Sequence, residues 1–145
     1  MAQSKNWQAM LEEWFGKLPN LPKGGRDFIV MVTPWLTLIG GILAILGGIT
    51  VFGLSAVFSP LMVLGGGMGV ASHSFLSGII LLVAGVIMLL AFPGLRAKKM
   101  KGWNLLFWSI LVWLVSSLVE FDIVGGIIWT LVDLYFLYQI KSYYK

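Results

Sequence analysis

Four long hydrophobic segments constrain the fold of this chain more than any other feature. They follow one another through most of the 145 residues. Each is about 17 residues or longer, which is the length that an α-helix needs to cross a bilayer. The segments are Phe28 to Gly53, Ser72 to Phe92, Trp103 to Val119 and Ile123 to Ile140. The pattern predicts an all-α integral membrane protein, a four-helix antiparallel transmembrane bundle.

The basic residues indicate how this bundle is oriented. All ten Lys and Arg residues lie before the first segment, between the second and the third, or after the fourth. Short loops that carry Lys and Arg remain on the cytoplasmic side of a membrane. We therefore expect an integral protein of the inner (plasma) membrane with both termini in the cytoplasm. The residues are Lys5, Lys17, Lys23, Arg26, Arg96, Lys98, Lys99, Lys101, Lys141 and Lys145.

The composition excludes several classes of function. With 59% hydrophobic and 11% charged residues, the chain lies outside the soluble range of about 25% charged. Residues 24–145 hold the four spans, which leaves no room for a soluble catalytic domain. The net charge of +4 predicts attraction to anionic lipid headgroups rather than to nucleic acid. Without cysteine, thiolate metal sites and cysteine nucleophiles are excluded, and we expect no metal and no cofactor.

Residues 1–23 form a separate cytoplasmic element. Apolar side chains recur there at helical spacing, and Pro19 and Pro22 end the pattern. We expect an amphipathic helix whose aromatic face, Trp7, Trp14 and Phe15, lies in the cytoplasmic lipid interface. The alternative is that the same face packs against the cytoplasmic ends of the bundle.

Small residues in the first span predict a helix-packing surface. Gly40, Ala44 and Gly48 recur at every fourth position, so one side of the helix is nearly bare backbone. Such stripes allow close approach of another helix. The partner is either another span of this chain or a second copy, in a homo-oligomer or a larger membrane complex.

Two parts of the chain allow alternative interpretations. Pro34 is either the first residue of a helix capped by Thr33 or a bend in a helix that begins near Asp27. Leu54 to Ala71, which holds Pro60 and several glycines, is expected to be irregular. It is either an extracytoplasmic connection on the membrane surface or a re-entrant loop that lines a cavity.

Two stretches of the C-terminal half resemble uncharacterised small four-span bacterial membrane proteins. They are Phe92-Pro93-Gly94-Leu95-Arg96, continuing through Lys101 to Phe107, and Leu137-Tyr138-Gln139-Ile140-Lys141-Ser142-Tyr143-Tyr144. The resemblance implies the same topology and a bacterial origin. It implies no activity.

Asp133 is the candidate for an ion or proton site. It lies eight residues before Lys141, about 12 Å deeper along a helix. An intramembrane carboxylate is costly and needs a partner or water. Measured from the turn between the last two spans, Ser109 lies opposite, with Thr130 and Trp113 near. The structural alternative is a carboxyl group satisfied by Ser109, a Trp N–H or a Lys side chain.

His73 is the candidate for cofactor binding. It is the single histidine, and Gly69 lies four residues earlier. The spacing resembles the small-xxx-His arrangement of light-harvesting helices, which implies tetrapyrrole ligation. The alternative is a hydrogen bond from the imidazole to a neighbouring serine or to water.

No motif of an enzyme is present. The sequence has no Ser–His–acid set, no HExxH and no phosphate-binding loop followed by lysine. We therefore expect a small non-enzymatic membrane protein that acts as a packing, accessory or self-associating subunit. The rival class is a small transporter or channel that uses Asp133, and it predicts a cavity reaching that residue. Tetrapyrrole binding through His73 is a second alternative.

Overall fold

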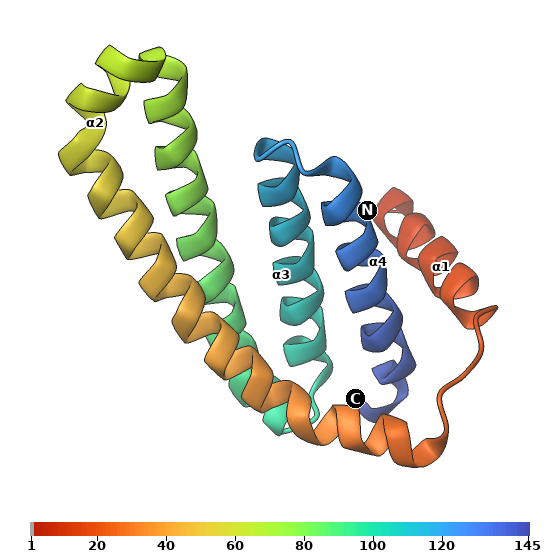
Figure 1. The fold of residues 1–145 in the computed structure, drawn as a ribbon. Coiled ribbons are helices and arrows are strands. Elements are labelled where there is room, and N and C mark those ends of the chain that lie inside the picture. Colours follow the sequence, from red (N-terminus) through yellow and green to blue (C-terminus); the bar gives the residue numbers. More distant parts are fainter. Residues whose placement is uncertain (1) are drawn as a thin grey trace.

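The fold is all-helical, as the sequence predicts. The computed structural model describes residues 2–145, and it describes the side chains of all of these except residues 2–6, 8 and 70. Residues 2–145 contain no strand. Along the chain the helices are α1 (Ala2–Gly16), α2 (Lys23–Arg96), α3 (Met100–Val119), α4 (Ile123–Gln139) and the short 3-10 helix η1 (Lys141–Tyr143) (Figure 1).

Among the residues that the structure describes, three helical stretches are long and apolar enough to cross a membrane. They are two parts of α2, Lys23–Gly69 and Ala71–Arg96, and the whole of α3. α4 is also apolar but has 17 residues. Its length is therefore about 25 Å at 1.5 Å per residue, about one turn short of a typical hydrocarbon core. The length and composition of the two parts of α2 and of α3 therefore support a membrane location.

α2 folds back on itself at Gly67. This glycine has φ 80° and ψ 176°. Such a backbone conformation is open almost only to glycine, because a Cβ atom would clash with the neighbouring peptide groups. Helix precedes and follows this residue, so α2 consists of two arms that run back along each other from the tip (Figure 1, yellow to green).

The helical state of residues 54–66 corrects our expectation of an irregular connection from Leu54 to Ala71. The first arm does not end near Gly53, because helix continues to the turn at Gly67 and resumes after it. An uncharged run of Leu, Val and Met can keep its backbone hydrogen bonds inside a helix, which satisfies them away from water. Within α2, Gly67 is the residue with non-helical backbone angles.

Pro34 lies inside the first arm, so the longer helix is the correct alternative. α2 begins at Lys23 and passes through Pro34. The Thr33 hydroxyl donates to the carbonyl of Ile29 at 2.6 Å, one turn back, rather than capping a helix start. The orange part of α2 changes direction in Figure 1. Proline explains such a bend, because it lacks the N–H of the helical hydrogen bond.

The stripe of small residues packs against the second arm of α2. A Cβ atom on Gly40 would lie 2.8 Å from Met88 Cε, and one on Gly48 would lie 2.8 Å from Leu82 Cγ. Between them, Ala44 is only 5% exposed. The partner of the stripe is thus the same chain, and the small residues let the two arms approach closely.

α3 and α4 form the second hairpin. Asp122 caps α4 by accepting a hydrogen bond from the Gly125 N–H at 3.2 Å. A Cβ atom on Gly126 would overlap Ser117, so the two helices lie very close next to the turn, as their equal distance from it predicts.

The two hairpins meet most closely where α2 ends and α3 begins. A Cβ atom on Gly102 would overlap the backbone of Gly94, so the helices cross in direct backbone contact. The chain end joins this crossing. Lys145 N–H donates to the Lys98 carbonyl at 3.0 Å, and Met100 N–H donates to the Lys145 carbonyl at 2.9 Å.

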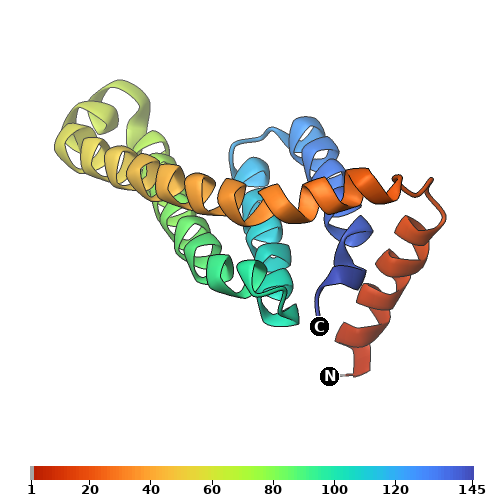
Figure 2. The ribbon, with the colours of Figure 1, turned by 90° about the horizontal axis from the view of Figure 1, so that it is seen from below.

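The linker after α1 and the start of α2 cross the lower ends of α3 and α4 (Figures 1 and 2). Two hydrogen bonds attach the linker to α4. The Tyr135 hydroxyl donates to the Pro19 carbonyl at 2.6 Å, and Leu21 N–H donates to Gln139 Oε1 at 3.3 Å. These contacts hold the linker and α4, which are far apart in the sequence, together at one end of the molecule.

α1 packs against the same end through two aromatic side chains. The ring of Trp7 lies 5.8 Å from that of Phe107, and Phe15 stacks on Tyr138 at 5.2 Å, measured between ring centroids. Trp14, by contrast, is 69% exposed. Two residues of the aromatic face, Trp7 and Phe15, therefore pack against the bundle, as one alternative predicts. The third, Trp14, lies on the surface.

Candidate functional site

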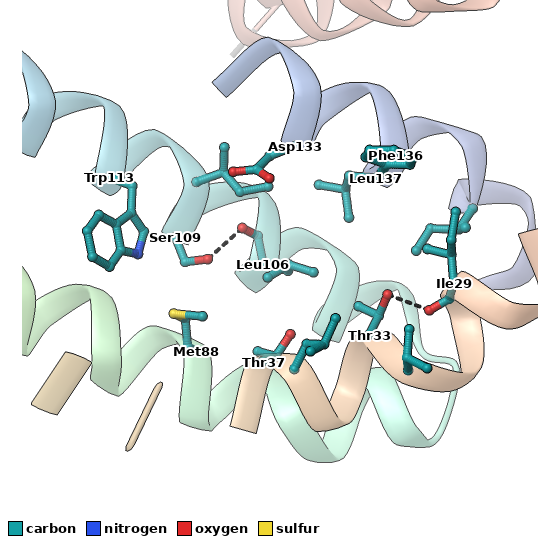
Figure 3. A pocket seen from close by; sticks show the side chains of 14 residues that line it. Ile29, Thr33, Thr37, Met88, Leu106, Ser109, Trp113, Asp133, Phe136 and Leu137 are labelled. Carbon is teal, nitrogen blue, oxygen red and sulfur yellow. Dashed lines mark hydrogen bonds between the residues drawn. The ribbon is translucent and has the colours of Figure 1, made fainter. Parts of the chain in front are cut away.

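A cavity of about 460 Å³ lies between the first arm of α2 and the α3–α4 hairpin (Figure 3). Most of its lining is apolar, and a few polar groups interrupt it. Small-molecule sites in proteins have this size and this composition. The lining residues are Ile29, Val32, Thr33, Leu36, Thr37, Met88, Leu106, Ser109, Ile110, Trp113, Asp133, Phe136, Leu137 and Ile140.

Asp133 is the charged residue of this lining. It projects from α4 into the cavity (Figure 3). Among the described residues, no side chain or backbone group forms a hydrogen bond or an ion pair with its carboxyl group. The carboxyl group is thus available to a bound molecule, to water or to a proton.

The predicted partners of Asp133 do not satisfy it. Ser109 lines the cavity, as expected, but its hydroxyl donates to the carbonyl of Leu106 at 2.7 Å (Figure 3). Trp113 also lines the cavity. Thr130 is buried elsewhere on α4 and lies outside the lining. The structure therefore brings Asp133, Ser109 and Trp113 together and separates Thr130 from them.

Sequence reasoning missed the contribution of α2. Thr33 and Thr37 lie one turn apart on the first arm and face the cavity, and Met88 reaches it from the second arm (Figure 3). The four-residue spacing of the two threonines was a usable signal, because such residues share one side of a helix. Which part of the fold the two threonines face depends on how α2 packs against α3 and α4.

His73 lies away from this cavity. Its Nε2 atom is 2.7 Å from the Val119 carbonyl, and because a carbonyl accepts, the imidazole donates. This bond joins the second arm of α2 to the end of α3. Tetrapyrrole ligation through Nε2 would have to displace it.

The cavity can bind an apolar molecule, and its single carboxyl group can pair with a cation or take up a proton. The lining holds no histidine and no second acid next to Asp133. General acid–base chemistry by paired side chains is therefore not built into this site. Comparisons with protein families, curated proteins and solved structures give no match for this chain.

Proposed function

We propose that the chain is a non-enzymatic, four-span protein of the bacterial inner membrane with both termini in the cytoplasm. The spans are the two arms of α2, α3 and α4. The arrangement of charge supports this topology. The ends of the helices that carry Arg26, Arg96, Lys101 and Lys141 lie together. The two charged side chains of the α3–α4 turn, Glu120 and Asp122, are both acidic.

Cysteine labelling in intact cells tests this topology. The natural chain has no cysteine, so one introduced residue gives an unambiguous signal. We expect Glu120→Cys, in the α3–α4 turn, to react with a membrane-impermeant maleimide added outside. Lys99→Cys, in the α2–α3 loop, should react only after the cells are opened. The reverse pattern would overturn the orientation, and reaction of both residues from outside would overturn the membrane crossing.

We propose further that the cavity around Asp133 binds a small hydrophobic cation, as a small transporter would. The observation that carries this proposal is an accessible carboxyl group without a partner in a mainly apolar cavity. A carboxylate at this depth is costly when it is alone. A cationic group would pair with it, while the apolar lining would cover the rest of the molecule.

Binding of tetrabutylammonium to the purified protein tests this second proposal. Trp113 in the lining gives a fluorescence signal for titration. We expect saturable binding that Asp133→Asn weakens about tenfold, because a charge-assisted contact is lost. Glu120→Gln is the matched control, since it removes an acid of the same hairpin outside the cavity. Equal affinity of native protein and Asp133→Asn would overturn the proposal.

A packing or accessory role is the second candidate function. The small-residue stripe no longer supports it, because the second arm of α2 already covers Gly40 and Gly48. The exposed Trp14 and the exposed outer side of α2, which includes Leu43 and Leu46, support it instead. A stable homo-oligomer with no affinity for hydrophobic cations would favour this candidate over the first.

A further inference from the structure

A second cavity, of about 430 Å³, lies under α1 at the end of the molecule that carries most of the basic residues. It is assembled from α1, the linker, the first turn of α2 and the C-terminal segment. Residues 12–26 line one side of it and residues 138–144, with Met100, line the rest, so only the folded chain brings these parts together. It shares no lining residue with the cavity around Asp133.

Two hydrogen-bonding groups of this lining are buried without a partner. They are Nε of Arg26 and the hydroxyl of Tyr144, and Tyr144 is only 3% exposed. A buried polar group that makes no hydrogen bond is rare and costly, and it calls for an unobserved ligand, ion or water. Because guanidinium can only donate, the missing group must be an acceptor.

The Tyr144 hydroxyl is also available as a donor at neutral pH. Burial raises the pKa of its hydroxyl to about 12, so the proton stays in place. The two donors thus belong to residues from separate segments of the chain that line one cavity. A group with several acceptor oxygens could accept from both.

The charges of the lining favour an anion. Lys141 Nζ lies 2.9 Å from Glu12 Oε2, so this acid and this base are already paired. Lys141 also lies over the ring of Trp103, 5.2 Å from its centroid, which helps to hold it there. Arg26 makes no ion pair among the described residues. It therefore leaves one unmatched positive charge in the cavity.

We propose that this cavity binds a phosphate group, which accepts hydrogen bonds from Arg26 and Tyr144. A planar guanidinium suits phosphate oxygens, and a buried phenol adds a neutral donor. The group belongs either to an anionic lipid headgroup or to a soluble phosphate compound. The position of the cavity beside the helix ends, where headgroups meet basic residues, makes the lipid the first source to test.

Native mass spectrometry of the full chain in detergent tests the proposal with phosphatidylglycerol as the lipid probe and phosphatidylcholine as its reference. In parallel, inorganic phosphate serves as the soluble probe, with the melting temperature as readout. The variants are Arg26→Gln, which removes the charge, and Tyr144→Phe, which removes only the hydroxyl. Lys101→Gln is the matched control, since it removes an exposed basic charge outside the cavity.

We expect selective retention of phosphatidylglycerol that Arg26→Gln weakens about tenfold and Tyr144→Phe weakens less, as loss of a hydrogen bond to a charged group implies. Stabilisation by inorganic phosphate without lipid retention, lost in the same two variants, would support the site and assign it to a soluble compound. Equal effects of Arg26→Gln and Lys101→Gln would overturn the proposal, as would the absence of both responses. If Arg26→Gln does not fold, the proposal is tested by Tyr144→Phe, and unchanged phosphatidylglycerol retention and unchanged phosphate stabilisation in that variant would overturn it. Asp133→Asn should leave this binding unchanged.

Discussion

The Lys141 ammonium group lies 2.9 Å from the Glu12 carboxylate, although 129 positions separate the two residues in the sequence. This contact and the stacking of Phe15 on Tyr138 hold α1 against the end of the bundle. The ion pair is partly exposed, and such pairs contribute about 0–1 kcal/mol. The buried ring of Phe15 should therefore contribute more to the docking of α1.

We expect Phe15→Ala to undock α1, since loss of a buried Phe side chain costs about 3 kcal/mol. Trypsin should then cut the linker at Lys17 or Lys23 at least tenfold faster. Glu12→Gln should change this rate only about twofold, in line with the small contribution of an exposed pair. Met10→Ala is the control, because Met10 is 59% exposed. Equal rates for Phe15→Ala and Met10→Ala would contradict the docking that we describe.

Gly48→Leu should destabilise the chain without changing its oligomeric state. The added side chain would meet Leu82 of the same chain, and overpacking of this kind costs about 1–3 kcal/mol. Gly47→Leu is the matched control, because a Cβ on Gly47 meets no atom within 4 Å. Melting temperature and light-scattering mass in the same detergent provide the two readouts. A lower mass for Gly48→Leu would instead assign the stripe to a contact between copies.

Gly67→Ala should weaken the turn between the arms of α2. A Cβ atom in this backbone conformation costs about 1–3 kcal/mol, and the glycine has φ 80° and ψ 176°. Gly65→Ala should be neutral or slightly stabilising, because Gly65 is helical and has open space around it. Thermal unfolding of the two variants side by side checks this difference. A Gly67→Ala variant as stable as Gly65→Ala would place the turn elsewhere.

The stability of the native chain should fall as the pH rises above about 10. Burial raises the pKa of Tyr144 to about 12, and a hydrogen bond to Asp27 is the main cause that raises the pKa of Tyr143. Between the unfolded value near 10 and the higher folded value, the native state holds more protons than the unfolded state. Stability contributed by these groups is therefore complete below pH 10 and is lost as the pH rises toward 12.

Melting temperatures measured from pH 8 to pH 11.5 check this alkaline loss. Tyr144→Phe should flatten the curve, because it removes the more deeply buried group, and Tyr143→Phe should flatten it less. All other ionisable groups are the same in the three proteins, so differences between the curves report on the two tyrosines. A native curve and a Tyr144→Phe curve of the same slope would contradict the burial of this hydroxyl.

Several features of the fold could be predicted because they depend on short stretches of sequence. Apolar runs identify the helical segments of α3 and α4, and Asp122 with its neighbours identifies the turn between them. The long helix through Leu54 could not be predicted in the same way. Glycine and proline there are typical of loops, yet the uncharged neighbours sustain helix until one glycine turns the chain.

Some residues of the candidate sites could be predicted from the sequence, and others could be assigned only from the packing of the helices. Asp133 could be selected from sequence, because a lone acid within an apolar segment is rare. Thr37 and Met88 could not be assigned to the same cavity, since their distance from Asp133 is set by packing between α2 and the second hairpin. Arg26 and Tyr144 are further still from one another in sequence, and no local pattern joins them.

The sequence by itself determined an all-helical, membrane-compatible chain, with its basic residues confined to the ends and connections of the apolar segments. Hydrophobicity, helical spacing and charge are local properties, and they remain legible without any long-range contact. Only the tertiary structure decided that the stripe of Gly40 and Gly48 faces its own chain, that Gly67 makes the turn, and that Asp133 and Arg26 line separate cavities. These outcomes depend on which surfaces pack together, because close packing is a property of pairs of elements and not of either element alone.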